Sequence, residues 1–239
     1  MKIKKILFHK ENKYYWKEGD LHTEYGLVKE EDIKTKSNMK SHKEKDFIAI
    51  PASFLDNLEK MKRGPQVMTA KDIGEIITRT GMNKDSKVLE IGAGSGALIL
   101  FMARIAKQIV SYEIREDHVK VVEKNLKDFE ITNVELKNLD ASIEIKEKDF
   151  DIATIDIMEP WTVINNAENS LRSGGYIVSY SPSITQVENL VKSANDNPNL
   201  IVLKTLETIE RPWDIKGRIV HPEFRIMGHT AFLTFIRKI

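Results

Sequence analysis

From Lys87 to the end of the chain, short apolar runs alternate with amphipathic segments, and this alternation constrains the fold more than any other feature. Strands that alternate with helices are typical of crossover units on a parallel sheet. Seven strands are predicted, at residues 87–91, 108–113, 134–137, 150–157, 176–179, 201–208 and 231–236. Helices are predicted in four of the gaps, at about residues 95–106, 116–129, 161–171 and 184–196.

The segment before the last predicted strand indicates how that strand runs. Residues 210–230 hold two prolines and two glycines, which leaves no room for a crossover helix. Without a crossover, the last two strands are expected to lie antiparallel. The chain is therefore predicted to be an α/β protein with a Rossmann-like sheet of seven strands whose last strand is antiparallel, unlike the all-parallel sheet of a dinucleotide-binding domain.

The first 85 residues follow a different pattern. Residues 1–50 are predicted to form a small N-terminal β domain, from runs with β character at 3–8, 13–16, 26–29 and 47–50. Residues 51–85 are predicted to be a helical connection, with helices at 53–61 and 70–80. The predicted sheet then occupies a third segment, residues 86–239.

Composition excludes several classes of site. The chain contains no cysteine, which excludes disulfides, thiolate zinc sites and any thiol nucleophile. Its six histidines are scattered without the spacing of metal ligands, so no metal site is expected. No stretch approaches the roughly 18 consecutive apolar residues of a membrane span, and the start of the chain lacks a secretory signal. We therefore expect a globular, cytoplasmic protein.

Cations are concentrated near the start of the chain. Six of the first 17 residues are lysines, and they are interleaved with Phe8, Tyr14, Tyr15 and Trp16. Such a segment could contact a phosphate backbone. Lysines that protect a strand edge from aggregation would give the same pattern, and the sequence leaves both explanations open.

A glycine-rich turn, Gly92-x-Gly94-x-Gly96, follows the first strand of the predicted sheet and leads into an apolar helix. Glycines suit a place where the backbone turns sharply and a ligand lies against it. The pattern Gly92-x-Gly94-x-x-Ala97 also fits the dinucleotide fingerprint. Glu113 ends the second strand, 19 residues after Gly94. Its carboxylate could accept hydrogen bonds from both ribose hydroxyls of a nucleoside, whether in a dinucleotide or in S-adenosylmethionine.

The charge beside the turn distinguishes the two cofactors. Glu90 precedes the turn, where a carboxylate would repel a pyrophosphate and attract the cationic amino-acid end of S-adenosylmethionine. Asp140, just past the third strand, can accept a hydrogen bond from an adenine amino group. For each acid taken alone, a helix cap or a solvated loop is the alternative. Taken together, the strand-end residues resemble the cofactor site of the class I S-adenosylmethionine-dependent methyltransferases.

An acidic residue also ends the fourth predicted strand, in Asp156-Ile157-Met158-Glu159-Pro160-Trp161. A carboxylate beside the cofactor can accept a hydrogen bond from an exocyclic amine and stabilise positive charge on a ring nitrogen as the methyl group arrives. This would suit methylation of an adenine, whose N1-methylated form is a cation near neutral pH. The same residue types also fit a turn in which Asp156 starts a helix, Pro160 takes its first position and Trp161 packs as core.

Five separated motifs resemble the tRNA (adenine-N1)-methyltransferases that modify the T-loop. They are Asp156 to Trp161, Tyr180-Ser181-Pro182-Ser183-Ile184-Thr185-Gln186, His221-Pro222 followed by Gly228-His229-Thr230-Ala231-Phe232-Leu233, His22-Thr23-x-x-Gly26, and Lys62-Arg63-Gly64-Pro65-Gln66. The resemblance covers nearly the whole chain. One segment departs from it: the family often has Tyr-Pro before Lys-Asp, whereas this chain has Met68-Thr69-Ala70 there, which puts in doubt an aromatic contact to the base.

The resemblance implies methyl transfer from S-adenosylmethionine to N1 of an adenine in the T-loop, at position 58 alone or at 57 and 58. It also implies a homotetramer that binds tRNA across its subunits. Asp156 would be the catalytic carboxylate, and Tyr180 and His229 would line the acceptor pocket unless they are structural. The cofactor residues, from the turn and from the resemblance together, are Glu90, Gly92, Gly94, Ser95, Gly96, Ala97, Leu98, Glu113, His118, Asp140 and Asp156.

Other activities are weighed against the same residues. A class I methyltransferase for a small molecule, such as a corrinoid precursor, would share the core but not the N-terminal domain or the His229-Thr230 segment. A non-catalytic tRNA-binding subunit is expected to lose the glycine turn or Asp156, and this chain keeps both. Methylation of a pyrimidine carbon requires a cysteine nucleophile. Exocyclic amino methylation usually places the acid directly beside Pro-Pro-aromatic, whereas three residues separate Asp156 from Pro160 here.

Overall fold

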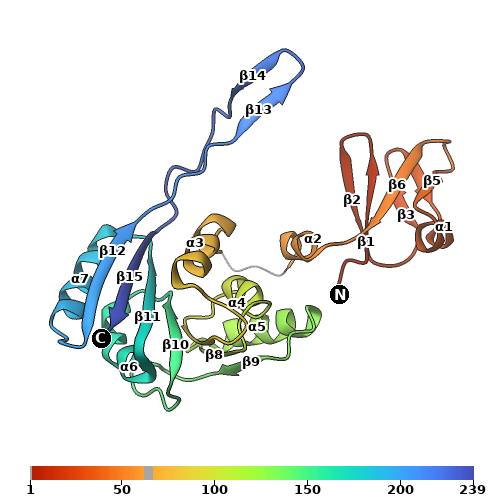
Figure 1. Cartoon of the computed structure of the whole chain (residues 1–239). Helices are drawn as coiled ribbons and strands as arrows, with labels where there is room; N and C mark the ends of the chain where they lie inside the picture. The colour runs from red at the N-terminus through yellow and green to blue at the C-terminus, as the bar shows by residue number, and fades with distance from the viewer. Residues whose placement is uncertain (1, 62–66) are drawn as a thin grey trace. The chain divides into compact units, whose positions relative to one another are not determined.

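The computed structural model describes residues 2–61 and 67–239. The chain forms two compact units, Met1–Lys62 and Arg63–Ile239, each with its own core (Figure 1). The segment that we expected to be a helical connection is shared between them, because α2 (Phe54–Glu59) belongs to the first unit and α3 (Ala70–Thr80) to the second. The motif at residues 62–66 lies outside the described residues.

The first unit is built on a four-stranded antiparallel sheet in the order β2-β1-β6-β5. These strands are β1 (Lys5–His9), β2 (Asn12–Trp16), β5 (Asn38–Lys40) and β6 (Asp46–Pro51). A hairpin of β3 (Leu21–Thr23) and β4 (Gly26–Val28) and the helix α1 (Glu30–Thr35) complete the unit. The sequence did not predict β3, β5 or α1, because each is only three to six residues long.

Side chains of the basic N-terminal segment have structural partners inside this unit. Lys13 pairs with Asp56 at 2.8 Å and with Glu59 at 3.1 Å, and Tyr15 donates a hydrogen bond to the same glutamate. Trp16 is buried in the core. Since β2 is also an edge strand of the sheet, these contacts favour the explanation that the segment protects and anchors that edge.

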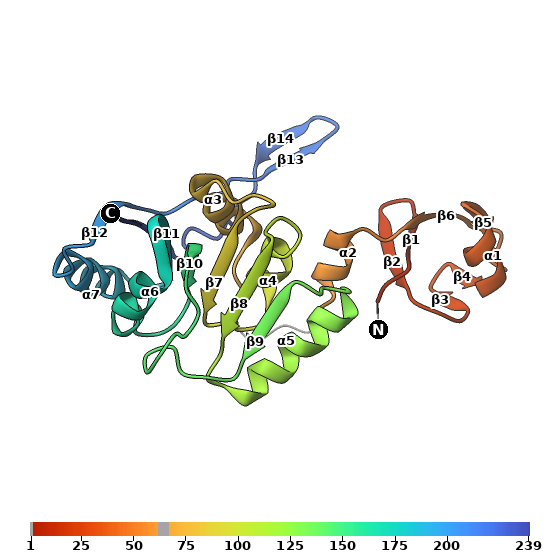
Figure 2. The ribbon, with the colours of Figure 1, turned by 60° about the horizontal axis from the view of Figure 1, so that its bottom comes forward.

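The second unit carries a seven-stranded sheet in the order β12-β15-β11-β10-β7-β8-β9. Its strands are β7 (Lys87–Ile91), β8 (Gln108–Tyr112), β9 (Val134–Lys137), β10 (Phe150–Ile155), β11 (Leu171–Ser181), β12 (Leu200–Leu206) and β15 (Phe232–Lys238). Strands β7 to β11 are parallel, and β15 lies between β11 and β12 and is antiparallel to both. The predicted sheet, with its antiparallel last strand, is confirmed. Figure 2 shows the run of strands from β10 to β9.

Helices cover both faces of this sheet. Buried residues of α3, α4 (Ala97–Met102) and α5 (Glu116–Asp128) pack against one face, and those of α6 (Ile164–Ser170) and α7 (Ile184–Asn195) against the other. The predicted helix at 161–171 is a short 3-10 turn, η1 (Pro160–Thr162), followed by α6. Strand β11 begins five residues earlier than predicted, because a register shift between Phe150 and Ile152 accommodates its glycine pair.

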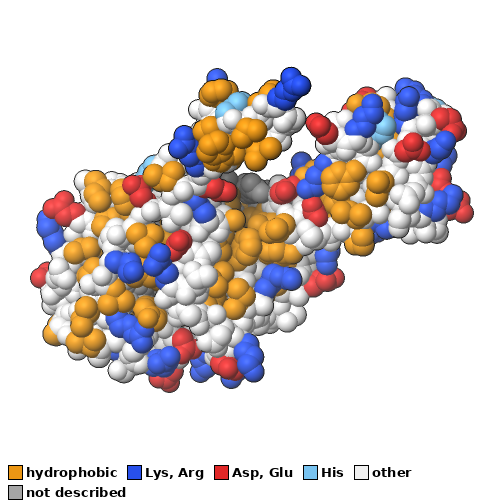
Figure 3. Space-filling view, turned by 45° about the horizontal axis from the view of Figure 1, so that its top comes forward, with side chains coloured by type: hydrophobic (Ala, Val, Ile, Leu, Met, Phe, Trp, Pro, Cys, Tyr) orange, Lys and Arg blue, Asp and Glu red, His pale blue; other side chains and the backbone are white. Residues whose placement is uncertain are grey.

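A two-stranded hairpin, β13 (Trp213–Lys216) and β14 (Ile219–Pro222), occupies the segment before β15, where the sequence excluded a crossover helix but predicted no strand. Its strands pair only with each other among the described strands, and Figure 1 shows the hairpin projecting beyond β12. Large apolar side chains cover it and the segment that follows (Figure 3): Trp213, Ile215, Ile219, Val220, Phe224 and Met227 are all more than half exposed. In residues 2–61 and 67–239, no helix is long and apolar enough to span a membrane.

Candidate active site

The glycine turn begins at the end of β7, which lies beside the end of β10. The backbone amide of Asp156 at the end of β10 donates a hydrogen bond to the carbonyl of Ile91 at 2.9 Å. Gly92 has a φ of 93°, and a Cβ at this position would lie 2.2 Å from the carbonyl oxygen of Asp156. Only glycine fits there, because both the backbone conformation and the close approach exclude a side chain. The turn therefore places the cofactor motif against the acidic strand end.

Glu113 fixes the other side of the turn. Its Oε2 accepts a hydrogen bond from the Gly94 amide at 3.0 Å, and its Oε1 accepts one from the Arg115 amide at 2.9 Å. His118 lies at the start of α5 with its Nδ1 3.5 Å from Glu113 Oε2. Each carboxylate oxygen still has a free lone-pair direction, which leaves Glu113 able to accept further hydrogen bonds from a ligand.

The residues after the turn are largely buried. Ser95, Ala97 and Leu98 have relative exposures of only 5–6%. The Ser95 carbonyl accepts a hydrogen bond from the Asn125 side chain at 2.9 Å, and the Gly96 amide donates to Ala93 at 2.8 Å. These contacts fix the local backbone. The predicted role of this stretch in cofactor binding thus depends on its backbone more than on its side chains.

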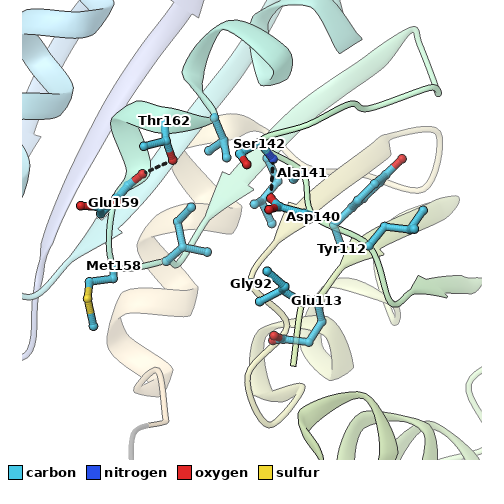
Figure 4. A pocket seen from close by; sticks show the side chains of 14 residues that line it. Gly92, Tyr112, Glu113, Asp140, Ala141, Ser142, Met158, Glu159 and Thr162 are labelled. Atoms are coloured by element: carbon cyan, nitrogen blue, oxygen red, sulfur yellow. Dashed lines mark hydrogen bonds between the residues drawn. The ribbon is translucent and has the colours of Figure 1, made fainter. Parts of the chain in front are cut away.

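A pocket of about 340 Å³ opens at the carboxyl ends of the strands, within the size range of small-molecule sites. Figure 4 shows Glu113 and Asp140 on one side of it and Met158 and Glu159 on the other. Asp140 Oδ1 accepts a hydrogen bond from the Ser142 amide at 2.8 Å, which orients the carboxylate. The remaining lining is mostly apolar: Ile91, Ile114, Leu139, Ala141, Ile157 and Val163. The pocket thus combines apolar walls with three carboxylates, those of Glu113, Asp140 and Glu159.

Glu90 lies beneath the turn and does not line the pocket. It is 1% exposed, and its Oε2 accepts a hydrogen bond from the Ser111 hydroxyl at 2.6 Å. Burial, with smaller contributions from the charges of Asp156 and Glu113, raises the pKa of Glu90 to about 8. A side chain buried to this extent does not reach the pocket, so the predicted direct contact of Glu90 with a cofactor there does not fit its position.

Asp156 carries the second raised pKa. Its side chain is open to solvent on one side, yet desolvation by the surrounding protein and the charge of Glu113 raise its pKa to about 7. Among the described residues, neither Asp156 nor Glu90 has an ion-pair partner. Three acids thus lie around the turn, and within the described part of the chain none of them forms an ion pair with a lysine or arginine, an arrangement that favours a cationic ligand.

Tyr180 and His229 were predicted to line the acceptor pocket, and the structure constrains the positions of both. Tyr180 is 6% exposed; burial and then the charges of Asp72 and Asp156 raise its pKa to about 12, so it remains a neutral donor. His229 has Nδ1 2.8 Å from Glu207 Oε2 and Nε2 2.9 Å from the Pro182 carbonyl oxygen. The Pro182 carbonyl, followed by Glu207, raises the pKa of His229. With both ring nitrogens engaged, His229 is held in place and not available as a free base.

The protein-family comparison decides the relationship that these motifs suggest. Residues 55–223 match the model of the tRNA methyltransferase complex GCD14 subunit. The chain belongs to this family. It is also 32% identical to the tRNA (adenine(57)-N(1)/adenine(58)-N(1))-methyltransferase TrmI of Methanocaldococcus jannaschii, in an alignment that covers 90% of this chain and 86% of that protein.

Solved structures confirm the predicted methyltransferase fold. The tRNA (m1A58) methyltransferase TrmI of Aquifex aeolicus superposes with a TM-score of 0.83 at 26% identity, over 99% of this chain and 96% of that one. A SAM-dependent O-methyltransferase of Thermotoga maritima superposes with a TM-score of 0.89 at 25% identity, over 99% and 93%. This GCD14-family chain therefore has the S-adenosylmethionine-dependent methyltransferase fold with the additional N-terminal sheet.

Two features of the GCD14-family site were not predicted. Gln186 Nε2 donates to the Met158 carbonyl at 2.7 Å while its Oε1 accepts from the Ser183 amide, so the start of α7 holds the loop after Asp156. A Ser followed three residues later by Gln is a capping-box pattern, and this pattern in the sequence could have predicted the contact of Gln186 with Ser183. The second feature is a buried network around Asp72, described below.

The loop after Asp156 also answers a question that the sequence left open. Glu159, not Asp156, is the N-cap of η1, and Pro160 occupies the first turn. The explanation of Asp156 as a helix start is therefore wrong, although that of Pro160 is correct. Trp161 is half-buried. Within the described residues, no group of three His, Asp or Glu side chains is arranged to hold a metal ion.

Proposed function

We propose that this protein transfers a methyl group from S-adenosylmethionine to N1 of an adenine in the T-loop of tRNA. The observation that supports this most strongly is the contact between Gly92 and Asp156, which puts a methyltransferase cofactor turn directly beside an uncompensated carboxylate. Family membership and the names of the relatives from Methanocaldococcus jannaschii and Aquifex aeolicus support the same reaction.

The site suits S-adenosylmethionine in both shape and charge. The apolar walls of the pocket can hold an adenine ring, with Asp140 beside its amino group and Glu113 able to accept from the ribose hydroxyls. The acids around the turn favour its cationic sulfonium and amino groups. We assign the cofactor to the turn residues 92–98, to Glu113, His118 and Asp140, and to the charges of Glu90 and Asp156. When bound, it supplies an electrophilic methyl group.

The proposed role of Asp156 follows from where charge develops. The lone pair of the adenine N1 forms the new bond to carbon as the carbon–sulfur electron pair stays on sulfur, so the positive charge moves onto the adenine ring. An ionised Asp156 stabilises this charge and accepts a hydrogen bond from the exocyclic amine. Tyr180, a neutral donor, and the fixed His229 border the adenine.

The adenine must leave its stack in the T-loop before its N1 can meet the methyl group, which costs a few kcal/mol. Contacts to the surrounding tRNA have to offset this cost. We infer that they come from several subunits of a homotetramer, and the exposed apolar hairpin supplies a surface that an oligomer would bury. Because the proposed substrate is tRNA, we also expect the protein in the cytoplasm.

The test is methylation of unmodified tRNA with labelled S-adenosylmethionine, followed by nucleoside mapping. We expect N1-methyladenosine at position 58, and matched transcripts with guanosine at 58 or at 57 show which adenines are used. Label at another position, or none, would contradict the proposal. A protein that binds the cofactor and tRNA without turnover would instead be a non-catalytic subunit. Sedimentation velocity on the same preparation gives the size of the oligomer.

A further inference from the structure

A buried carboxylate, Asp72, lies in the first turn of α3 and is 0% exposed. It is held by side chains from two distant parts of the chain. Its Oδ2 accepts hydrogen bonds from Thr69 Oγ1 and Thr230 Oγ1, both at 2.8 Å, and its Oδ1 accepts one from Lys71 Nζ at 2.8 Å. Burying a charge is costly, and these contacts offset the cost for the Asp72 carboxylate. They thereby fix the start of α3 against the segment that contains Thr230.

The network is closed at Thr230. Lys71 Nζ donates to Thr230 Oγ1 at 2.6 Å, and this hydroxyl donates in turn to Asp72. The direction of each hydrogen bond is therefore set, since an ammonium group can only donate. A helix cap alone does not explain the arrangement: Thr69 makes no side-chain bond to the backbone of α3 and donates to Asp72 instead.

The segment that Asp72 holds reaches the acceptor side of the site. Thr230 follows His229 and precedes the buried Ala231, which leads into β15. Strand β15 pairs with β11, with Leu233 opposite Tyr180. The charges of both Asp72 and Asp156 contribute to the raised pKa of Tyr180, and the Thr230 hydroxyl opposes them. Asp72 is fully buried and cannot touch tRNA, so it can act only through its partners.

We propose that Asp72, through Thr230 and Lys71, is a positioning residue that aligns the Tyr180 and His229 side of the acceptor pocket with Asp156. This rests on the proposed methyl transfer. The cofactor turn lies outside this network, so the network should affect the acceptor side of the pocket and not its cofactor side. Loss of the network should misplace the adenine without weakening the binding of S-adenosylmethionine.

Two substitutions with matched controls test this. Asp72→Asn keeps the size and one acceptor oxygen but removes the charge, and Thr230→Val removes only the hydroxyl. We expect each to lower kcat by about 10- to 100-fold, as misplacement of a reacting group does, with the Kd for S-adenosylmethionine unchanged within about twofold. Thr230→Ser should restore most of the activity. Asp151→Asn is the control for stability, because Asp151 binds Arg172 and the Lys87 amide at the opposite ends of the strands.

Hydrogen exchange gives a readout that does not require activity. Amides 229–233 should exchange faster in Asp72→Asn and Thr230→Val than in the wild type, while amides 92–96 stay unchanged. Wild-type kcat in both variants, or an equal loss of kcat in Asp151→Asn, would overturn the positioning role. Unchanged exchange at 229–233 would also overturn it. A wild-type protein that fails to methylate tRNA would contradict the proposed function instead, and the exchange result would still decide whether Asp72 orders this segment.

Discussion

The parallel strands of the seven-stranded sheet end at an amino edge on one side and a carboxyl edge on the other, and acids at these two edges have opposite surroundings. At the amino ends of the parallel strands, Asp151 accepts hydrogen bonds from the Lys87 amide and from Arg172, and Arg237 stacks over the Tyr176 ring at 3.9 Å. At the carboxyl ends, burial and the charges of neighbouring acids raise the pKa values of Glu90 and Asp156. The acid at one edge is compensated and contributes to stability, whereas the acids at the other ionise unfavourably until a cationic ligand binds beside them.

Replacing Asp156 should have the largest effect on methyl transfer, because it removes an acid from the carboxyl edge. Asp156→Ala removes both the charge and the hydrogen-bond acceptor, and we expect kcat to fall by about 10³-fold, the upper range for removing one electrostatic stabiliser. Asp156→Asn keeps an acceptor and should lose less. The Kd for S-adenosylmethionine, measured by calorimetry, should change by no more than about fivefold, because the pocket and Glu113 remain.

The control lies at the other edge. Asp151→Asn should lower the free energy of unfolding by about 1 kcal/mol, since the ion pair with Arg172 is partly exposed, and leave kcat intact. Asp156→Ala should not lower the stability, because it removes an uncompensated charge. Full methylation activity in Asp156→Ala would remove this residue from the mechanism.

The sequence predicted best what is encoded locally. The bounds of β7, β9 and α3 match the structure, because each has a strong apolar pattern. The hydrogen bond between Gly94 and Glu113 was not predicted, although both residues were assigned to strand ends of one cofactor site. The contact of Asp72 with Thr230 joins residues 158 positions apart, and no local pattern records it. The burial of Glu90 was missed because a carboxylate so close to a glycine turn was read as facing the ligand. Strands of a parallel sheet are covered on both faces, which leaves such a side chain inside.

The carboxyl edge also depends on the close approach at Gly92, and this gives the second prediction. Gly92→Ala forces a Cβ to within 2.2 Å of the Asp156 carbonyl and strains a φ of 93°. We expect binding of S-adenosylmethionine to weaken by at least about tenfold, with a lower melting temperature, because the turn must shift. Gly94→Ala is the matched control, since it is strained in φ alone and has open space around its Cβ. Equal effects in the two variants would mean that the contact with Asp156 does not shape the turn.

The smallest predicted effect is the dependence of stability and cofactor affinity on pH. An acid whose pKa is raised in the folded state keeps its proton there after the unfolded chain has lost it, so stability falls as the pH rises from about 4 towards the folded pKa values of about 7 and 8. A cation at the turn favours the ionised acids and releases protons when it binds. The affinity for S-adenosylmethionine should therefore rise by about tenfold between pH 6 and 9, which corresponds to one pKa unit of differential interaction.

Calorimetry in buffers with different ionisation enthalpies measures this proton release directly. Glu90→Gln should reduce both the release and the pH dependence of the affinity, because glutamine fills the same buried space without titrating. S-adenosylhomocysteine lacks the sulfonium charge, so its affinity should vary less with pH than that of the cofactor. If the two ligands showed the same pH dependence, the sulfonium would not be what the acids at the carboxyl edge recognise. The acids at the carboxyl edge would then interact only with the amino-acid and ribose parts that the two ligands share.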